Sequence, residues 1–226
     1  MPMQRASPRT TVIIGGNAGA RIACEIFRLC DPRQRICVLD CFAPTASWKK
    51  MKPVVLKGKK EDKENLDFLR KKNVSYFVAT GDNAMRKDIT EFLIAETKKS
   101  PENCIHPSAY IAPSASIGNG NLICPHAAIH THAEVHDGTI INTGAVIEHD
   151  NVIGDYAQIS PNVSLAGCVR VEDLAFVSTG ASVIPHITIG TASLVAAGAV
   201  VTKDVKPRTM VAGCPATVKK LLKRHG

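Results

Sequence analysis

Every sixth residue from Ile105 to Val201 is isoleucine, valine or leucine, through seventeen positions without a gap or an insertion. Four residues after each of these positions the side chain is usually small. A period of six matches neither the 3.6-residue repeat of a helix nor the two-residue alternation of a simple strand. The small residues are Ala109, Ala115, Ala127, Ala133, Ala145, Ala157, Ala175, Ala181 and Ala199.

A six-residue period predicts a short strand followed by a turn, with three such units making one triangular coil of 18 residues. The branched residue points into the resulting prism, and the small residue lets the chain turn. Gly118, Gly154 and Gly190 fall at expected turns, where permissive backbone is needed. Stacked coils pair as parallel strands about 4.8 Å apart, so five to six coils make a rod of roughly 27 Å. The pattern therefore predicts an all-β hexapeptide-repeat β-helix.

The first hundred residues follow a different pattern. An apolar strand at Thr11–Ile14 runs into a Gly-rich turn at residues 15–19, a helix carries Ile22, Ile26 and Leu29 on one face, and Arg35–Leu39 is a second strand. A third strand is expected near Val74–Ala79, followed by a helix at residues 86–98. We expect a small Rossmann-like α/β domain over residues 1–100 and the β-helix with a basic tail over residues 101–226.

Backbone N–H groups at a Gly-rich helix start favour phosphate, so this turn predicts a nucleotide site, although such turns are as often purely structural. Gly15, Gly16 and Asn17 belong to the turn, and Asp40 follows the second strand, where an acidic side chain can bind a ribose or a base edge. Asn83 lies in the corresponding turn after the third strand.

Charge is unevenly distributed along the chain. Lysine and arginine outnumber acidic residues 20 to 11 in residues 1–100 and 6 to 0 in residues 205–226, whereas residues 101–204 carry 2 basic and 9 acidic side chains. Nucleic-acid binders interleave basic and aromatic residues, and only 4% of this chain is aromatic, so we expect no nucleic-acid partner. The basic tail is expected either to form a C-terminal helix or to contact a phosphate-bearing ligand.

Apolar runs and cysteine spacing indicate the compartment in which the protein is expected. No apolar run approaches the roughly 18 residues of a membrane span, and the first residues lack a signal-peptide core, so we expect a cytoplasmic protein without a membrane span. The eight cysteines contain no CxxC pair and are expected to be reduced thiols.

Five segments make the chain resemble the bacterial nucleotide-amino-sugar acetyltransferases, which include the bacillosamine-pathway and perosamine N-acetyltransferases and the sialic acid O-acetyltransferase-like proteins. The resemblance covers nearly the whole chain and implies a left-handed coil, acetyl-CoA as co-substrate and a homotrimer with sites between subunits. The segments are Val12–Gly16, Ala79–Arg86, Asn142–Asp150, Leu165–Gly167 and Gly213–Ala216.

The resemblance implies that His149 is the general base and that Asp150 orients its imidazole, although Glu148 is an alternative. Asn142 corresponds to a residue near the acceptor amine, and the N–H of Gly167 to a donor for the acetyl carbonyl. His149 and Gly167 are 18 residues apart, so they are expected to lie on adjacent coils about 5 Å apart.

The resemblance implies that acetyl-CoA lies along the later coils, where Gly180, Gly198 and Lys203 are candidates for contact. The two glycines are equally consistent with close packing between subunits. Two positions depart from the family. Gly19 replaces a frequent histidine near the nucleotide phosphates. Gln158, which replaces a second frequent histidine, implies that the acetyl group is held differently.

A metal centre is not expected. The spacing of four histidines in one stretch lacks the His-x4-His pair of the hexapeptide carbonic anhydrase; these are His126, His130, His132 and His136.

The function expected is acetyl-CoA-dependent N-acetylation of a nucleotide-linked amino sugar, such as a 4-amino-4,6-dideoxy sugar, for glycan assembly. O-acetylation of a sialic-acid-like sugar and a non-catalytic hexapeptide scaffold are the alternatives.

Overall fold

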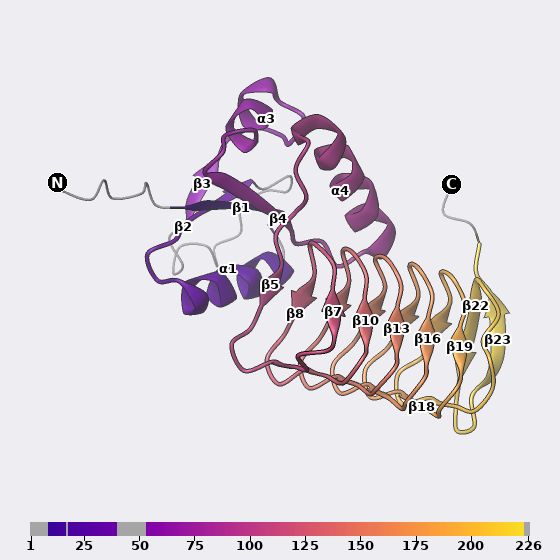
Figure 1. Cartoon of the computed structure of the whole chain (residues 1–226). Helices are drawn as coiled ribbons and strands as arrows, with labels where there is room; N and C mark the ends of the chain where they lie inside the picture. Colours follow the sequence, from indigo (N-terminus) through magenta and orange to yellow (C-terminus); the bar gives the residue numbers. More distant parts are fainter. Residues whose placement is uncertain (1–8, 17, 40–52, 224–226) are drawn as a thin grey trace.

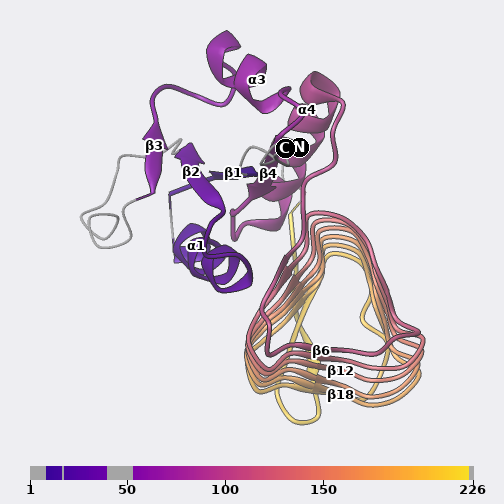
Figure 2. The same ribbon diagram turned by 60° about the vertical axis from the view of Figure 1, so that its left-hand side comes forward.

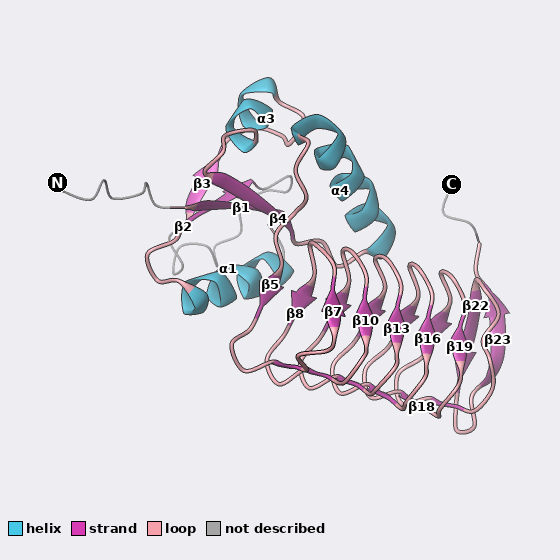
Figure 3. Ribbon diagram, in the orientation of Figure 1, coloured by secondary structure: helices cyan, strands magenta, loops and turns pink. Residues whose placement is uncertain are grey.

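The computed structural model describes residues 9–16, 18–39 and 53–223 and contains two parts (Figure 1). All helices of the described residues lie in the N-terminal part, and the rest is built of short strands and turns (Figure 3). We call residues 9–97 the α/β unit and residues 104–212 the prism. Asn17 and Asp40, expected in the nucleotide site, lie outside the described residues. No helix in the described ranges is long and apolar enough to cross a membrane.

The α/β unit is built on a four-stranded parallel sheet with the strand order β3-β2-β1-β4. The expected strands are present, while β3 and α3 have no counterpart in the sequence-based prediction. β3 is only three residues long and partly exposed, so it has no clear apolar pattern. The elements are β1 (Thr10–Ile14), α1 (Ala18–Cys30), β2 (Arg35–Leu39), β3 (Val54–Leu56), α3 (Lys63–Leu69), β4 (Val74–Val78) and α4 (Asn83–Thr97).

The buried face of α1 differs from the expected one. Ile22 and Leu29 are 39% and 60% exposed, so of the three predicted residues only Ile26 is buried. The helix packs closely on both the sheet and the prism, so most of its buried residues are small. The buried residues are Ala20, Ala23, Cys24, Ile26 and Phe27.

The prism confirms the predicted β-helix. Strands 18 residues apart pair in parallel, as in Ile105↔Ile123 and Ile123↔Ile141, and three sheets form its faces (Figure 2). The left hand of the coil stays a prediction. The first face contains β5 (Cys104–Ile105), β8 (Leu122–Ile123), β11 (Ile140–Ile141), β14 (Gln158–Ile159), β17 (Phe176–Val177) and β20 (Leu194–Val195). The second contains β6 (Tyr110–Ile111), β9 (Ala128–Ile129), β12 (Val146–Ile147), β15 (Ser164–Leu165), β18 (Ser182–Val183) and β21 (Val200–Val201). The third contains β7 (Ser116–Ile117), β10 (Glu134–Val135), β13 (Val152–Ile153), β16 (Arg170–Val171) and β19 (Thr188–Ile189).

The predicted inward positions form the core of the prism. Fourteen of the seventeen, from Ile123 to Val201, are buried, and the first three, in the first coil, are partly buried. The alanines at the small positions pack in the same cluster, as Ala145 and Ala181 do. Each coil therefore contributes aliphatic and small side chains to a narrow interior, which explains the low aromatic content.

Gly118, Gly154 and Gly190 lie at turns as expected, but the residues with left-handed backbone at the corners are others. Every sixth residue from Gly120 to Gly198 has a φ between 52° and 70°. Gly118, Gly154 and Gly190 are not among them; they are glycine because a Cβ would collide with the next coil, 2.5 Å from Asp173 Oδ1 in the case of Gly154. The three corner rows are 120, 138, 156, 174 and 192; then 126, 144, 162, 180 and 198; then 132, 150, 168 and 186.

The chain ends in a hairpin, not in a helix. β22 (Thr209–Ala212) extends the first face beyond β20, and β23 (Thr217–Leu221) pairs with it in antiparallel orientation. Lys219 and Lys220 are exposed on β23. The helical alternative for the basic tail is therefore wrong for the described residues.

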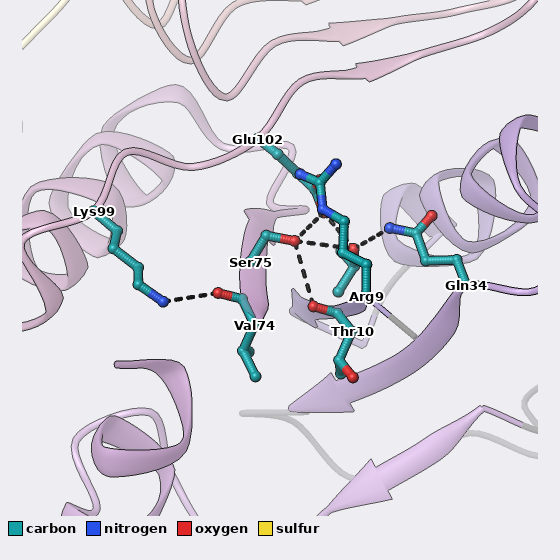
Figure 4. Close-up of polar contacts among 8 residues, drawn as sticks. Arg9, Thr10, Gln34, Val74, Ser75, Lys99 and Glu102 are labelled. Carbon is teal, nitrogen blue, oxygen red and sulfur yellow. Dashed lines mark hydrogen bonds and ion pairs between the residues drawn. The ribbon is translucent and has the colours of Figure 1, made fainter. Parts of the chain in front are cut away.

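Polar contacts fix the segment between α4 and β5, where we placed the domain boundary (Figure 4). Lys99 Nζ donates to the carbonyls of Leu69 and Val74, both at 2.8 Å. The Glu102 carboxylate accepts from Ser75 Oγ at 2.8 Å and also from Thr11 Oγ1. These contacts hold the segment against the amino ends of β1 and β4, opposite the edge at which the Gly-rich turn lies.

Candidate functional site

His149 and Asp150 occupy a corner of the prism between β12 and β13. His149 Nδ1 lies 2.7 Å from Asp150 Oδ2, and the His149 side chain is 57% exposed. Since an ionised carboxylate only accepts hydrogen bonds, Nδ1 donates its proton to Asp150, and in the neutral ring this leaves the lone pair on Nε2. Asp150 has a φ of 57°, a left-handed conformation that aspartate tolerates better than most residues. The arrangement is that of an imidazole whose orientation is fixed by a carboxylate.

Gly167 lies beneath this imidazole on the next coil. A Cβ built on Gly167 would lie 2.5 Å from both Cε1 and Nε2 of His149, so any side chain there would displace the ring. The backbone N–H of Gly167 has no acceptor among the described residues, whereas the next amide, of Cys168, donates to the His149 carbonyl at 3.0 Å. The Gly167 backbone, whose N–H is free, thus lies against the ring of His149, and acyl transfer requires a base and a donor of this kind.

Glu148, the alternative partner for His149, points elsewhere. Its Oε1 lies 4.0 Å from Nε2 of His130. The structure therefore gives the orienting contact to Asp150.

A cavity of about 240 Å³ lies at the carboxyl end of β4, beside the first residues of α1. This edge of a parallel sheet is where α/β folds bind ligands. Gly15, at the end of β1, has a φ of 125°, and a Cβ there would lie 3.0 Å from the Ala79 carbonyl oxygen. Gly16 follows it and is buried. The cavity is lined by Ala18, Gly19, Phe77, Val78, Ala79, Thr80, Gly81, Arg86, Gly120, Leu122 and Ile140.

A larger groove of about 760 Å³ runs from the first residues of α4 along the later coils. Gly81 lines both the cavity and the groove. The groove is lined by basic side chains at Lys87, Arg208 and Lys223 and by acidic ones at Asp82 and Asp88. The buried Ser193 hydroxyl, also in the lining, has no hydrogen-bond partner. The groove therefore presents side chains of both charges, with the basic ones in slight excess.

Arg86, which the sequence analysis did not single out as a site residue, joins the α/β unit to the prism. The side chain is 2% exposed. It donates to the carbonyls of Gly138 (2.6 Å), Tyr156 (2.8 Å) and Thr80 (2.9 Å) and to Asn83 Oδ1 (2.9 Å). Burial lowers the pKa of Arg86 to about 10, which leaves it charged at neutral pH.

Asn83 shares this linking role. Its Nδ2 donates to the Leu174 carbonyl at 3.1 Å, so both ends of the amide are held by the protein. Asn83 still lines the groove, but its polar atoms are engaged within the chain.

Asn142 and Gln158 lie away from His149 within one chain. Asn142 Oδ1 accepts from the Thr143 N–H at 2.8 Å, just after β11. Gln158 points outward from β14, and its Oε1 is buried without a partner. Gln158 belongs to the first face and Asn142 to the turn that leaves it. Other first-face residues line the cavity and the groove, namely Leu122, Ile140, Phe176 and Leu194.

The remaining acetyl-CoA candidates also stand apart from His149. Gly180 and Gly198 belong to another corner row, and a Cβ at either would meet open space, so contacts within the chain do not require glycine there. Their φ values of 68° and 66° do favour it. Lys203 is exposed near the end of the prism.

The His149 corner is the edge of the triangle opposite the first face. Figure 2 shows the α/β unit beside the first face, and the sheet labelled β6, β12 and β18 on the far side. With sides of about six residues, the corner stands about 15 Å from that face. One chain therefore does not bring its own cavity, groove and Gln158 to its own His149.

The chain is similar in sequence and structure to known acetyltransferases. No family model matches the chain. The chain is 34% identical to PerB, the perosamine N-acetyltransferase of Caulobacter crescentus, solved with CoA and GDP-perosamine; the match covers 93% of this chain and 97% of PerB with a TM-score of 0.82. It is 28% identical to the acetyltransferase domain of PglB from Neisseria gonorrhoeae, solved with acetyl coenzyme A, over 94% of this chain and 100% of that domain, with a TM-score of 0.84.

Curated relatives match over shorter stretches. An acyl-[acyl-carrier-protein]–UDP-N-acetylglucosamine O-acyltransferase of Aliivibrio fischeri is 42% identical over 65 residues. The chain spans 25–40% of the length of the curated relatives it matches. PerB, by contrast, is matched over nearly its whole length. The chain belongs to the nucleotide-amino-sugar acetyltransferase family, a group of acyltransferases built on hexapeptide coils.

Proposed function

We propose that the protein transfers the acetyl group of acetyl-CoA to the amine of a nucleotide-linked amino sugar for glycan assembly. The observation that carries this proposal is the placement of His149, whose Nδ1 is hydrogen-bonded to Asp150 and whose ring lies against the backbone of Gly167, a residue with a free N–H. The binding of CoA and GDP-perosamine by PerB supports the class of both substrates.

The proposed reaction needs no enzyme-bound intermediate. The sugar amine attacks the thioester carbonyl of acetyl-CoA in a ternary complex, and Nε2 of His149 takes the proton that the amine loses. The Gly167 N–H stabilises the oxyanion of the tetrahedral intermediate. As the intermediate collapses, the C–S bond breaks, and protonated His149 returns the proton to the CoA thiolate. Asp150 favours the tautomer with its proton on Nδ1 and then stabilises the imidazolium.

We further propose that the active sites are shared between subunits of a homotrimer. Within one chain Gly15 and Gly16 directly precede α1, which packs on the first face, whereas His149 lies at the opposite corner. A second subunit with its His149 corner against the first face completes the site and brings Gln158 and Asn142 to it. Gly180 and Gly198, beside which the single chain leaves open space, then line the path of CoA.

The groove suits the anionic parts of the two substrates. Its lining includes Lys87 and Arg208, and Lys203 adds a further charge near the end of the prism. The nucleotide diphosphate and the CoA phosphates both need such donors.

A mass-spectrometric screen tests the proposed function. Purified protein and acetyl-CoA are incubated with UDP-, dTDP- and GDP-linked amino sugars and with free sialic acid. We expect one acetyl group to be added to the amine of a nucleotide-linked sugar. Acetylation of sialic acid alone would identify the O-acetyltransferase alternative. No transfer to any acceptor, together with no binding of acetyl-CoA, would favour the scaffold alternative.

A further inference from the structure

A third side chain, Cys168, converges on His149 and Asp150. One ligand atom from each of the three lies within 4.8 Å of both others, and among the described residues this is the group whose spacing suits a metal ion. The Cys168 N–H donates to the His149 carbonyl at 3.0 Å, which holds the two coils in register. None of the four histidines at residues 126–136 belongs to the group.

The same corner carries histidines on the coils to either side. His132, Asp150, Cys168 and His186 are spaced by 18 residues, and all four have φ values between 57° and 63°. Successive coils are about 4.8 Å apart, so His186 lies one coil from Cys168. The His186 N–H donates to the Gly167 carbonyl, which fixes this coil against the site. An additional nitrogen ligand is therefore within reach of a modest side-chain movement.

The chemistry of the three side chains suits zinc more than magnesium or calcium. Zinc takes imidazole nitrogen, thiolate sulfur and carboxylate oxygen at about 2.0–2.3 Å in tetrahedral geometry, whereas the other two ions prefer oxygen ligands. Shifts of about 1 Å would bring the three atoms to those distances. His149 and Asp150 are exposed and Cys168 is half-buried, so an ion has access from solvent. The excess of acidic residues in the prism also attracts cations.

We propose that His149, Asp150 and Cys168 bind one Zn²⁺ ion, with His186 or water as the fourth ligand, and that this ion reversibly inhibits the enzyme. Binding displaces the Cys168 thiol proton and occupies the His149 nitrogen or fixes the ring away from the substrate. The inhibitory half of this proposal rests on the proposed function of His149. The binding half stands on the ligand set alone.

Binding is tested with Co²⁺, whose thiolate complexes show a charge-transfer absorption band. Wild-type protein is titrated beside Cys168→Ser and a control variant, Cys30→Ser, which removes an exposed thiol elsewhere. We expect one equivalent of Co²⁺ to produce the band in the wild type and the control, and Zn²⁺ to abolish it. The band should be missing in Cys168→Ser. A band of equal size in Cys168→Ser, or none in the wild type, would overturn the proposal.

Inhibition is tested on initial rates of acetyl transfer at low conversion, because the CoA thiol produced also binds zinc. We expect Zn²⁺ to inhibit the wild type and Cys30→Ser equally and EDTA to restore the rate. Cys168→Ser should need at least 10-fold more Zn²⁺. Equal sensitivity of Cys168→Ser would refute the site. If no acetyl transfer is found with any acceptor, the proposed function fails, and the Co²⁺ titration still decides whether the metal site exists.

Discussion

The imidazole of His149 occupies the space that a side chain at position 167 would need, because Gly167 lies directly beneath it on the adjacent coil. The contact follows from the 18-residue spacing of the two positions. Gly167 leaves room for the ring, and its own backbone N–H is free.

Replacing Gly167 with alanine should therefore impair catalysis through His149. The added methyl group would displace the ring by more than 1 Å, and we expect kcat to fall about 10²-fold. Ser164→Ala, at an exposed position of the same coil, should retain normal turnover. Steady-state kinetics with a sugar-nucleotide acceptor measures both. A Gly167→Ala enzyme with unchanged kcat would show that the ring needs no such support.

Asp150 and Glu148 can be separated by matched amide substitutions. Asp150→Asn lets the amide donate to Nδ1, which places the ring proton on Nε2, so kcat should fall about 10²-fold. Glu148→Gln loses only a distant contact with His130 and should stay within about twofold of the wild type. The two kcat values, measured at saturating substrates, decide the assignment. A larger loss for Glu148→Gln would reverse it.

Arg86 should matter for stability more than its surface neighbours. Arg86→Met would leave buried acceptors at Gly138, Tyr156 and Thr80 without donors, at a cost of about 3–5 kcal/mol in the free energy of unfolding. The exposed Arg170 provides the control, because Arg170→Met should change stability by less than about 0.5 kcal/mol. Urea unfolding at a fixed protein concentration measures the difference. Equal stability of the two variants would refute the linking role.

If active sites are shared between subunits, two inactive variants with defects in different halves of the site should restore activity when they form mixed oligomers. Gly81 lines both the cavity and the groove, and a Cβ there meets nothing within 4 Å, so Gly81→Phe should fold and block the sugar nucleotide. Its KM for the sugar nucleotide should rise, with little change for acetyl-CoA. Refolding an equal mixture of Gly81→Phe and His149→Ala chains should restore about one quarter of the sites.

The complementation assay is run at a sugar-nucleotide concentration at which neither parent turns over. Mixtures of each variant with itself are the controls. Activity that stays at the parental level in the mixed oligomer would show that each chain builds its own complete site.

The prism could be predicted because single residues determine the register in which its coils pair. One branched side chain in every six must face inward, so Ile123, Ile141 and Ile159 fix the pairing of whole coils. The His149–Gly167 contact follows from the same arithmetic. The corners were harder to predict, because left-handed backbone there is taken up by residues as different as Tyr156, Leu174 and Ala192.

The α/β unit was less predictable because its faces are set by contacts between distant segments. Ile22 and Leu29 look like core residues on α1, yet the helix buries Ala20 and Ala23 against the sheet and the prism. The roles of Arg86 and Cys168 were missed for the same reason. Arg86 lies within a segment that carried the resemblance, but its acceptors, including Gly138, are remote in the chain. Cys168 falls in the same corner row as Asp150, and that spacing was the signal for its proximity.

The most direct test of the account compares acetylation of a nucleotide-linked amino sugar by wild-type, His149→Ala and His136→Ala enzymes, with acetyl-CoA affinity measured by calorimetry. We expect His149→Ala to lose at least about 10²-fold in kcat while its affinity for acetyl-CoA is unchanged, because only the base is removed. His136→Ala, which removes an exposed histidine from the third face, should match the wild type. Near wild-type turnover by His149→Ala would contradict the central claim that His149 accepts the amine proton.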